Sequence, residues 1–578
     1  MRTFIEVLRD NAIHDDRAVT FMRASGEERR VTYPDLWVET RRRAHALRAL
    51  GLEKGDRVAL ILPEPDEFVL TFIAALAAGI VAVPMYPPQT LAKMEAYGET
   101  VRHVLAASGA KVLVTNDGLK PLIQEHLLAD ASHAKLALER DVRGVVGSED
   151  EPLPRVDPDD LAFLQFTSGS TSKPKGVMVT HLNLSVNSHA IMFDGLKSTP
   201  ADRGVSWLPL YHDMGLIGFV IAPLYALVQV MFLPTMAFIR RPSLWLEAIH
   251  RFRGTITFAP NFAYALATRA VTETQAQHWD LSCMRALGCG AEPIQADVLR
   301  GFLTRFQKNG LRPESALPSY GMAEATLAVT FWDVTKEIVT DRVDLQAMKQ
   351  GRAEVIGAGA GADTASRAAM ELVCCGKPFP GHEIRIMGAG GALGDRRVGE
   401  IWLRGPSVTA GYFGNREATE ESFLDGWLRT GDLGYTTPDG LYICGRAKDL
   451  IILNGKNYYP QDIEQVVSRV DGIRDGQCVA FSRLDESGAE IAVVVAEARK
   501  ASQQLADALV HAVRAELGLT LGEVHLIKRS TLPKTSSGKV RRREAKLRLE
   551  TGELELLSDG SVDSGHPAAE HLASPAAM

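Results

Sequence analysis

Apolar positions along the first third of the chain alternate between helical spacing and short continuous runs. The helix-like stretches are 36–50, 68–78 and 100–108. The strand-like runs are 58–62, 80–84 and 111–115, and the same rhythm returns at 205–210, 228–233 and 255–259. Such alternation is typical of β–α–β units, in which amphipathic helices cover a sheet of parallel strands. We therefore expect an α/β fold in a large N-terminal region.

The pattern changes near residue 371, where strand-like runs become shorter and are separated by turns. Beyond a hairpin with its turn at 438–440, a smaller α+β unit is expected. Its elements are strands 450–453, 477–483 and 490–496 and helices 460–470 and 503–517. The predicted domains are an N-terminal domain over 1–445 and a C-terminal domain over 446–557, followed by a tail, 558–578. The tail is rich in Ser, Ala, Gly, Asp and His and is expected to be disordered.

One segment, 335–369, interrupts this order of elements. Its second half, 357–366, alternates Gly and Ala and has little to bury. Loops of this length are usually functional or disordered. We expect an insertion between core elements, with one helix near 341–351.

Composition indicates a globular protein of a reducing compartment. The 578 residues carry a formal net charge of −7, which gives no bias toward nucleic acid or anionic membranes. Six cysteines show no CxxC or metal-ligand spacing, as expected for a cytoplasmic protein, and the N-terminus does not resemble a signal peptide. The apolar stretches 69–83 and 216–233 are interpreted as buried elements. The first is short of the roughly 20 residues of a membrane span, and the second contains Pro223 and Gln229.

A hydroxyl-rich loop is the first motif that carries chemistry. The strand-like run 161–166 ends in Thr167-Ser168-Gly169-Ser170-Thr171-Ser172, and Lys173 and Lys175 follow. Backbone N–H groups, hydroxyls and lysines together suit an anionic phosphate tail. A flexible linker is the alternative, but flanking strands and lysines favour the phosphate loop. It is not a Walker A loop, because Pro174 stands where that pattern requires glycine.

Two further motifs place carboxylates where a nucleotide could use them. In the run 318–326, Glu324 follows an aromatic residue and a glycine, and its carboxylate could hold a cation near phosphates. The alternative is a surface glutamate in the first turn of a helix. Asp432 and Arg446 are equally spaced from the turn residue Asp439, so a hairpin would bring them together. That pair could grip ribose hydroxyls, or it could be an ordinary surface ion pair.

Three remaining motifs are weaker when taken singly. A Ser/Gly loop at 532–543 presents Lys539 and a basic run without aromatic residues, which does not favour nucleic acid. The glycines of 288–293 could let the backbone approach a base. The adjacent His212 and Asp213 are more typical of a structural histidine than of a catalytic base.

Eight segments occur together in a fixed order: TSGSTSKPKG, LYHDMG, GCGAEP, SYGMAEAT, GEIWLRG, RTGDLG, GRAKD and PKTSSGK. As a set they resemble the adenylate-forming superfamily of acyl-CoA synthetases, luciferases and peptide-synthetase adenylation domains, up to about residue 555. The resemblance implies a large N-terminal region of α/β subdomains, a hinge and a small mobile C-terminal domain. It also implies ATP as a substrate and Mg²⁺ as its companion ion.

The resemblance implies a role for each matching residue. The residues of the ATP or AMP site would be Thr167, Ser168, Gly169, Ser170, Thr171, Lys175, Gly290, Ala291, Glu292, Ser319, Tyr320, Gly321, Met322, Asp432, Arg446 and Lys539. Catalysis would fall to Lys539, Glu324 and Lys175. Glu324 and Thr167 would hold the metal, and Lys448 would be the hinge.

Within that superfamily the chain looks most like the fatty acyl-AMP ligases, because of the insertion 335–369 and the run 449–464. In that branch the insertion is thought to restrain the C-terminal domain and to disfavour the CoA step. The resemblance implies a fatty acid as substrate and an acyl carrier protein, or a synthase carrier domain, as acceptor. A fatty acyl-CoA synthetase is the alternative, an amino-acid adenylation domain is not excluded, and a non-catalytic nucleotide-binding relative is less favoured. The candidates for docking an acidic carrier are Arg541, Arg542, Arg543, Lys546 and Arg548.

Overall fold

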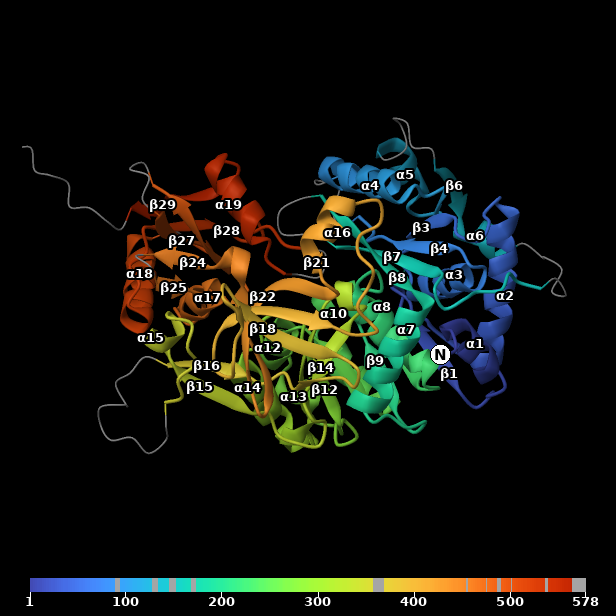
Figure 1. Ribbon diagram of the computed structural model, residues 1–578, viewed down its shortest axis with the longest axis horizontal. Helices are drawn as coiled ribbons and strands as arrows, with labels where there is room; N and C mark the ends of the chain where they lie inside the picture. The colour runs from blue at the N-terminus through green and yellow to red at the C-terminus, as the bar shows by residue number, and fades with distance from the viewer. Residues whose placement is uncertain are drawn as a thin grey trace, which may run out of the picture. The chain divides into compact units, whose positions relative to one another are not determined.

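The structure of the protein is a computed structural model (Figure 1). It describes residues 1–88, 94–126, 134–144, 152–167, 173–356, 369–453, 456–474, 476–485, 490–500, 502–535 and 539–563. The chain forms two compact units. Unit 1 comprises Met1–Asp341 and Glu371–Cys444, and unit 2 comprises Arg342–Met370 and Gly445–Met578. The insertion from Arg342 onward thus groups with the C-terminal part of the chain, whereas the sequence predicted it within the N-terminal domain.

The first sheet of unit 1 has the strand order β6-β5-β3-β4-β7-β8. Its strands are β3 (Arg57–Ile61), β4 (Val81–Pro84), β5 (Val112–Thr115), β6 (Lys135–Leu138), β7 (Leu161–Thr167) and β8 (Lys175–Thr180). The helices between them are α2 (Tyr33–Ala49), α3 (Pro65–Ala77), α4 (Met94–Ser108), α5 (Lys120–His126) and α6 (Glu139–Gly144). All neighbours pair in parallel except β7 and β8, which form an antiparallel hairpin. The predicted β–α alternation is confirmed.

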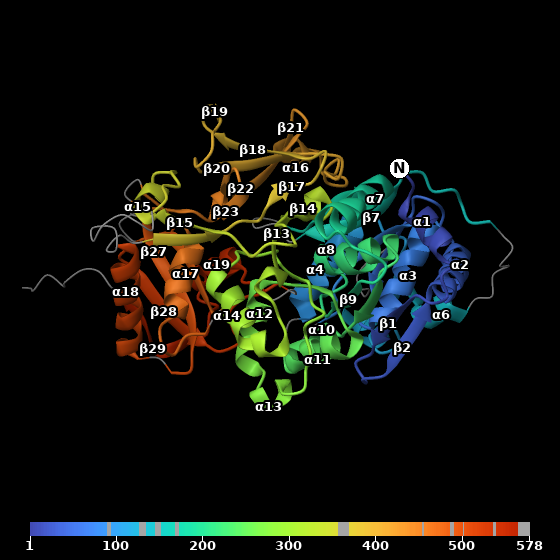
Figure 2. The ribbon, with the colours of Figure 1, turned by 90° about the horizontal axis from the view of Figure 1, so that it is seen from below.

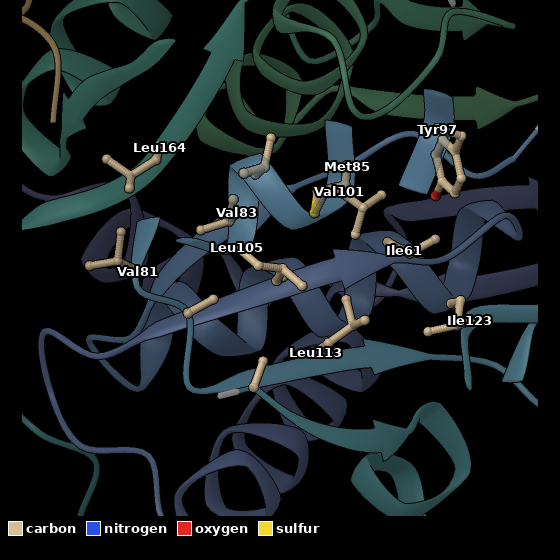
Figure 3. Close-up of a cluster of buried hydrophobic side chains, with 14 of the residues drawn as sticks. Ile61, Val81, Val83, Met85, Tyr97, Val101, Leu105, Leu113, Ile123 and Leu164 are labelled. Carbon is tan, nitrogen blue, oxygen red and sulfur yellow. The ribbon is translucent and has the colours of Figure 1, made fainter. Parts of the chain in front are cut away.

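A buried apolar cluster joins this sheet to α4. Ile61, Val83 and Leu113 of the strands pack with Val101 and Leu105 of α4, and all are almost fully buried (Figure 3). Strands of a parallel sheet are covered on both faces, which explains their continuous apolar runs. This packing fixes the sheet from which the β7–β8 hairpin extends.

The second sheet of unit 1 has the order β17-β14-β13-β12-β11-β9-β10-β1-β2. Its strands are β1 (Ala18–Met22), β2 (Glu28–Thr32), β9 (Arg203–Ser206), β10 (Gln229–Phe232), β11 (Ile256–Ala259), β12 (Ala286–Cys289), β13 (Ala316–Gly321), β14 (Ala328–Phe331) and β17 (Lys377–Pro378). The neighbouring strands β11, β12 and β13 are parallel. Their carboxyl ends therefore lie side by side, which is where open α/β sheets bind ligands.

Helical elements connect these strands. They are α1 (Phe4–Asn11), α7 (His181–His189), η2 (Ala190–Gly195), α8 (Asp213–Leu216), η3 (Ile217–Ile221), α9 (Ala222–Tyr225), α10 (Thr235–Arg240), α11 (Ser243–Phe252), α12 (Asn261–Ala270), α13 (Glu273–Ala276), α14 (Ala296–Phe306), η4 (Gln307–Asn309), η5 (Pro313–Ser315) and η6 (Ala323–Ala325). The apolar stretch 216–233 is divided among helical turns and β10. Most of it is buried, as expected. No helix in the described part of the chain is long and apolar enough to cross a membrane.

A third, antiparallel sheet completes unit 1, and Figure 2 shows β18, β20 and β22 side by side. Its elements are β18 (Glu383–Gly388), β19 (Gly391–Ala392), β20 (Gly399–Arg404), β21 (Phe423–Leu424), β22 (Trp427–Thr437) and β23 (Gly440–Arg446), with α16 (Arg416–Ser422) before β21. The predicted hairpin around 438–440 is confirmed, since β23 pairs with β22.

The insertion begins and ends in a two-stranded ladder of β15 (Thr340–Asp344) and β16 (Ala369–Val373). The helix expected near 341–351 is much shorter, since α15 spans only Leu345–Met348. The Asp344 carboxylate accepts hydrogen bonds from the backbone N–H groups of Gln346 and Ala347, so the helix starts after Asp344. The Gly/Ala stretch 357–366 lies outside the described residues.

Unit 2 also contains a sheet of order β26-β27-β28-β29. Its elements are η7 (Ala447–Asp449), β24 (Ile451–Leu453), β25 (Lys456–Tyr458), α17 (Pro460–Ser468), β26 (Cys478–Leu484), β27 (Glu490–Ala498), α18 (Gln503–Leu517), β28 (Glu523–Lys528), α19 (Arg542–Glu550) and β29 (Leu556–Asp563). β29 extends into the stretch expected to be a disordered tail, because it pairs with β28. Residues beyond Asp563 are outside the described part.

Candidate functional site

The β7–β8 hairpin holds the base of the hydroxyl-rich loop. Thr167 lies opposite Lys175, and Phe166 opposite Gly176. A Cβ atom on Gly176 would lie 2.9 Å from the Phe166 ring, so the hairpin leaves little room for a side chain there. The loop residues Ser168, Gly169, Ser170 and Thr171 lie outside the described residues. That the loop binds phosphate stays a prediction.

Glu324 belongs to η6, directly after β13, and the backbone of a distant segment fixes it there. The Thr409 N–H donates to the Glu324 carbonyl (2.8 Å). The same segment also pairs with β8: the Met178 N–H donates to the Gly411 carbonyl (3.0 Å), and the Phe413 N–H donates to the Gly176 carbonyl (2.8 Å). The segment that includes 409–413 therefore connects β8, and with it the base of the loop, to the turn that carries Glu324.

Tyr412 extends this connection with its side chain. Its hydroxyl donates to Glu324 Oε1 (2.8 Å), and the Nζ atom of Lys175 lies 5.1 Å from the centre of its ring. Burial and the Glu324 carboxylate raise the pKa of Tyr412, so its hydroxyl stays a donor at neutral pH. Tyr412 is not among the residues predicted from the sequence, because no periodicity links it to a glutamate 88 residues away.

The two oxygen ligands proposed for Mg²⁺ are suited to an ion that binds together with the phosphates of a nucleotide. Mg²⁺ is usually bound by one or two protein groups together with phosphate oxygens and water. Glu324 offers a carboxylate and Thr167 a hydroxyl. Among the described residues, no group of three or more His, Cys, Asp or Glu side chains could hold a metal ion.

The ends of β12 and β13 bring two of the predicted motifs together. The Ser319 hydroxyl donates to the Cys289 carbonyl (3.0 Å), and a Cβ atom on Gly290 would lie 2.6 Å from Ser319 Oγ. Ala291 has a left-handed backbone, with φ of 68°. The Glu292 carboxylate accepts from the Phe262 N–H (2.8 Å) in the first turn of α12. Glu292 therefore helps to fix the strand ends, and its predicted place beside an adenine stays a prediction.

Tyr320 links β13 to the third sheet. Its hydroxyl donates to Asp432 Oδ2 (2.8 Å), and both side chains are buried. The Asp432 N–H donates to the Thr430 hydroxyl (3.0 Å). At the end of β13, a Cβ atom on Gly321 would lie only 2.0 Å from the Leu327 carbonyl oxygen, and the Met322 N–H donates to that same oxygen. The strand end that carries Tyr320 is thus held by a turn that only glycine fits.

Six consecutive residues, 319–324, therefore connect most of the candidate site in unit 1. On one side they reach Gly290 through Ser319 and Asp432 through Tyr320. On the other side, Glu324 contacts Tyr412, which in turn contacts Lys175. The structure thus brings together in one unit groups that lie in four separate motifs of the sequence.

Three candidates belong to unit 2. Arg446 ends β23, and Lys448 lies in η7 immediately after it. Lys539 is held by its backbone, because its N–H donates to the Thr535 hydroxyl (3.0 Å) and its carbonyl accepts from the Thr535 N–H (2.7 Å). These bonds close the base of the Ser/Gly loop. The roles of the three residues at a nucleotide stay predictions.

Most of the basic residues suggested for carrier docking have internal partners in unit 2. Arg542 contacts Glu464 (2.6 Å) and Asp449 (3.0 Å) and donates to the Ala480 carbonyl. Lys546 donates to the Ser482 carbonyl (2.7 Å). Arg541 and Arg548 both pair with Glu544. Arg541, Arg542, Lys546 and Arg548 thus each have a partner within unit 2, and the part of the basic run in carrier docking stays a prediction.

Comparison with known proteins agrees with this arrangement. The family model of AMP-binding enzymes matches residues 9–413, and that of the AMP domain of Disco-interacting protein 2-like proteins matches residues 448–558. A Caulobacter vibrioides protein whose name proposes an acyl-CoA synthetase is 38% identical over 509 residues, 87% of each chain.

Two further matches concern fatty acyl ligases. The medium-chain-fatty-acid–acyl-carrier-protein ligase TtuA of Teredinibacter turnerae is 32% identical over 557 residues, 86% of this chain and 85% of its own. A solved structure from work on the fatty acyl-adenylate ligases of E. coli and L. pneumophila has a TM-score of 0.88 at 36% identity, and the match covers 96% of this chain and 98% of that one. The chain belongs to the AMP-binding enzyme family and is an adenylate-forming ligase of the fatty acyl-AMP ligase branch.

Proposed function

We propose that this protein activates a fatty acid with ATP to an acyl-adenylate and then transfers the acyl group to the phosphopantetheine thiol of an acyl carrier protein. The observation that carries the first step is the hydrogen-bonded chain in unit 1. Its hydrogen bonds join Glu324 to Tyr412 and Tyr320 to Asp432, and the Tyr412 ring faces the Lys175 ammonium group at the base of the phosphate loop. These are the groups that a triphosphate, its metal ion and a ribose require.

In the adenylation step, a carboxylate oxygen of the fatty acid attacks the α-phosphorus of ATP. The bond from that phosphorus to the bridging oxygen breaks, and pyrophosphate leaves. Lys175 and the hydroxyl-rich loop orient the leaving phosphates, and Asp432 with Arg446 holds the ribose. Mg²⁺ held by Glu324 and Thr167 would neutralise phosphate charge. Because no protein nucleophile is needed, rate enhancement comes from positioning and charge stabilisation.

Lys539 completes the proposed adenylation site. An ammonium group near the α-phosphate stabilises negative charge that develops on its oxygens as pyrophosphate departs. Two hydrogen bonds between Thr535 and Lys539 hold the backbone of Lys539 at the base of the Ser/Gly loop. Lys448 is proposed as the hinge on which unit 2 reorients between the two steps.

In the transfer step, the thiol sulfur attacks the carbonyl carbon of the acyl-adenylate. The bond from that carbon to the phosphate oxygen breaks, AMP leaves, and the thiol proton passes to solvent. The identity of the thiol, on an acyl carrier protein or on CoA, distinguishes the two candidate functions. The ligase TtuA is named for an acyl carrier protein, whereas the name of the Caulobacter vibrioides relative is that of an acyl-CoA synthetase.

The placement of the insertion supports the carrier protein as acceptor. Lys349, just after α15, is only 4% exposed, and its Nζ atom donates to the Leu517 carbonyl at the end of α18 (2.8 Å). The same atom lies 4.5 Å from the centre of the Tyr458 ring. These contacts bind the insertion to the C-terminal part of the chain. A segment anchored in this way can limit the reorientation that CoA transfer requires.

ATP–pyrophosphate exchange tests the adenylation step. We expect exchange that depends on fatty acids and that amino acids and short carboxylic acids do not support. No exchange with any carboxylate, despite ATP binding, would instead identify a nucleotide-binding relative without catalysis. Exchange driven by an amino acid would identify an amino-acid adenylation enzyme.

A further inference from the structure

Tyr412 lies between the two groups that are proposed to act on the charges of ATP. Its hydroxyl is hydrogen-bonded to Glu324, and its ring faces the Lys175 ammonium group. The residue is only 9% exposed, so solvent competes little for these contacts. We propose that Tyr412 is a positioning residue that aligns the metal-binding carboxylate with the phosphate-binding lysine. This inference rests on the proposed function.

Contacts of its backbone and of its ring hold Tyr412 in place. Val177 of β8 forms an isolated bridge with Tyr412, and the Gly411 carbonyl and Phe413 N–H bond to the same strand. The Tyr412 N–H donates to the Thr419 hydroxyl (3.0 Å). The ring also meets Phe423 edge-on, with the ring centres 6.2 Å apart. The tyrosine ring therefore has little freedom to move away from its two charged partners.

The two contacts of Tyr412 act on different parts of ATP binding. A hydrogen bond to one oxygen of the Glu324 carboxylate fixes the rotation of that group, and with it the direction of its second oxygen. The ring face attracts the Lys175 ammonium group and restricts a long, flexible side chain. Removing the hydroxyl should therefore affect the metal-dependent part of ATP binding. Removing the ring should also affect the metal-independent part.

The test measures the dissociation constant of ATP, without fatty acid, by calorimetry in Mg²⁺ and again in EDTA. For Tyr412→Phe we expect the constant in Mg²⁺ to rise about tenfold, which is typical for loss of a group that orients a metal ligand, and the constant in EDTA to stay unchanged. For Tyr412→Leu we expect both constants to rise, because Lys175 loses its support as well.

Tyr435→Phe is the matched control. Tyr435 is also a buried tyrosine of unit 1, and its hydroxyl donates to a carboxylate, Asp341 Oδ2, at 2.8 Å. Removing this hydroxyl also breaks a hydrogen bond to a carboxylate, but it should change the dissociation constant of ATP neither in Mg²⁺ nor in EDTA. Near-ultraviolet circular dichroism of each variant checks that the fold is retained, and Tyr412→Phe is conservative enough to carry the test alone.

The possible outcomes separate this inference from the proposed function. If the wild-type protein does not bind ATP, the proposed function fails, and the inference fails with it. If the wild-type protein binds ATP but Tyr412→Phe binds equally well in Mg²⁺, only the inference is overturned. An equal loss in Mg²⁺ and in EDTA would also overturn it, because that is the result of a general structural disturbance.

Discussion

At the scale of single residues, the end of β13 and the turn that follows it make three different side-chain hydrogen bonds. Ser319 bonds to the end of β12, Tyr320 bonds to Asp432, and Glu324 bonds to Tyr412. Each of the last two bonds runs from a tyrosine hydroxyl to a carboxylate, and hydrogen bonds to charged groups are worth about 1.5–3 kcal/mol. The carboxylates are thereby oriented before a nucleotide binds, which lowers the entropic cost of assembling the site.

The ribose role of Asp432 predicts a defined change in nucleotide selectivity. Asp432→Asn retains an acceptor for Tyr320 but loses charge and acceptor capacity. The KM for ATP in pyrophosphate exchange should rise about 10–100-fold, the equivalent of weakening one or more charged hydrogen bonds. Its preference for ATP over 2′-deoxy-ATP should also shrink. Asp439→Asn, in the exposed turn of the same hairpin, is the control. Unchanged discrimination would show that Asp432 does not bind the ribose.

The charge-stabilising role of Lys539 predicts that its loss slows the adenylation step without weakening ATP binding. Lys539→Ala should nearly abolish acyl-adenylate formation, while the calorimetric dissociation constant of ATP changes little, because the lysine acts mainly on charge that develops during the reaction. Lys528→Ala serves as the control, since Lys528 is an exposed lysine of the same unit. Pyrophosphate release at the wild-type rate from Lys539→Ala would contradict the role.

At the scale of elements, hydrophobic spacing was a good guide where helices and strands bury one face. The β–α alternation and the bounds of α18 are as predicted, because local periodicity determines them. The helix of the insertion is shorter than predicted, because the Asp344 cap starts it late. Tyr412 could not be predicted, because its partners come from other sheets. The anchor of the insertion could not be predicted either, because Lys349 donates a hydrogen bond to a carbonyl 168 residues away.

The hydrogen bond from Lys349 to Leu517 allows a test of the preference for the carrier protein over CoA. Lys349→Glu places a carboxylate against the Leu517 carbonyl and should release α15 from the C-terminal part. If the insertion restrains unit 2, acyl-CoA formation should rise by about 5–150-fold, the usual range of conformational coupling. Gln346→Glu makes a similar change on the exposed side of the same helix and should have no effect. The absence of any CoA activity in a folded Lys349→Glu variant would leave the restraint without support.

At the scale of the whole molecule, the two units have distinct parts in the proposed reaction. Unit 1 contains the strand ends and the hydrogen-bonded chain proposed to hold ATP. Unit 2 contains Lys448, Lys539 and the anchored insertion. An enzyme that uses one lysine for adenylation and another arrangement for thiol transfer needs units that can reorient. A restraint on one unit therefore affects thiol transfer more than the chemistry at phosphorus.

The most direct test of the account compares the two thiols in one assay. The protein is incubated with ATP, Mg²⁺ and a medium- or long-chain fatty acid, together with equal concentrations of CoA or of a holo-acyl carrier protein. Pyrophosphate release and thioester mass are then measured. We expect acyl-adenylate to form in both mixtures and the thioester to form almost only on the carrier. Thioester formation on CoA at an equal or greater rate would contradict it.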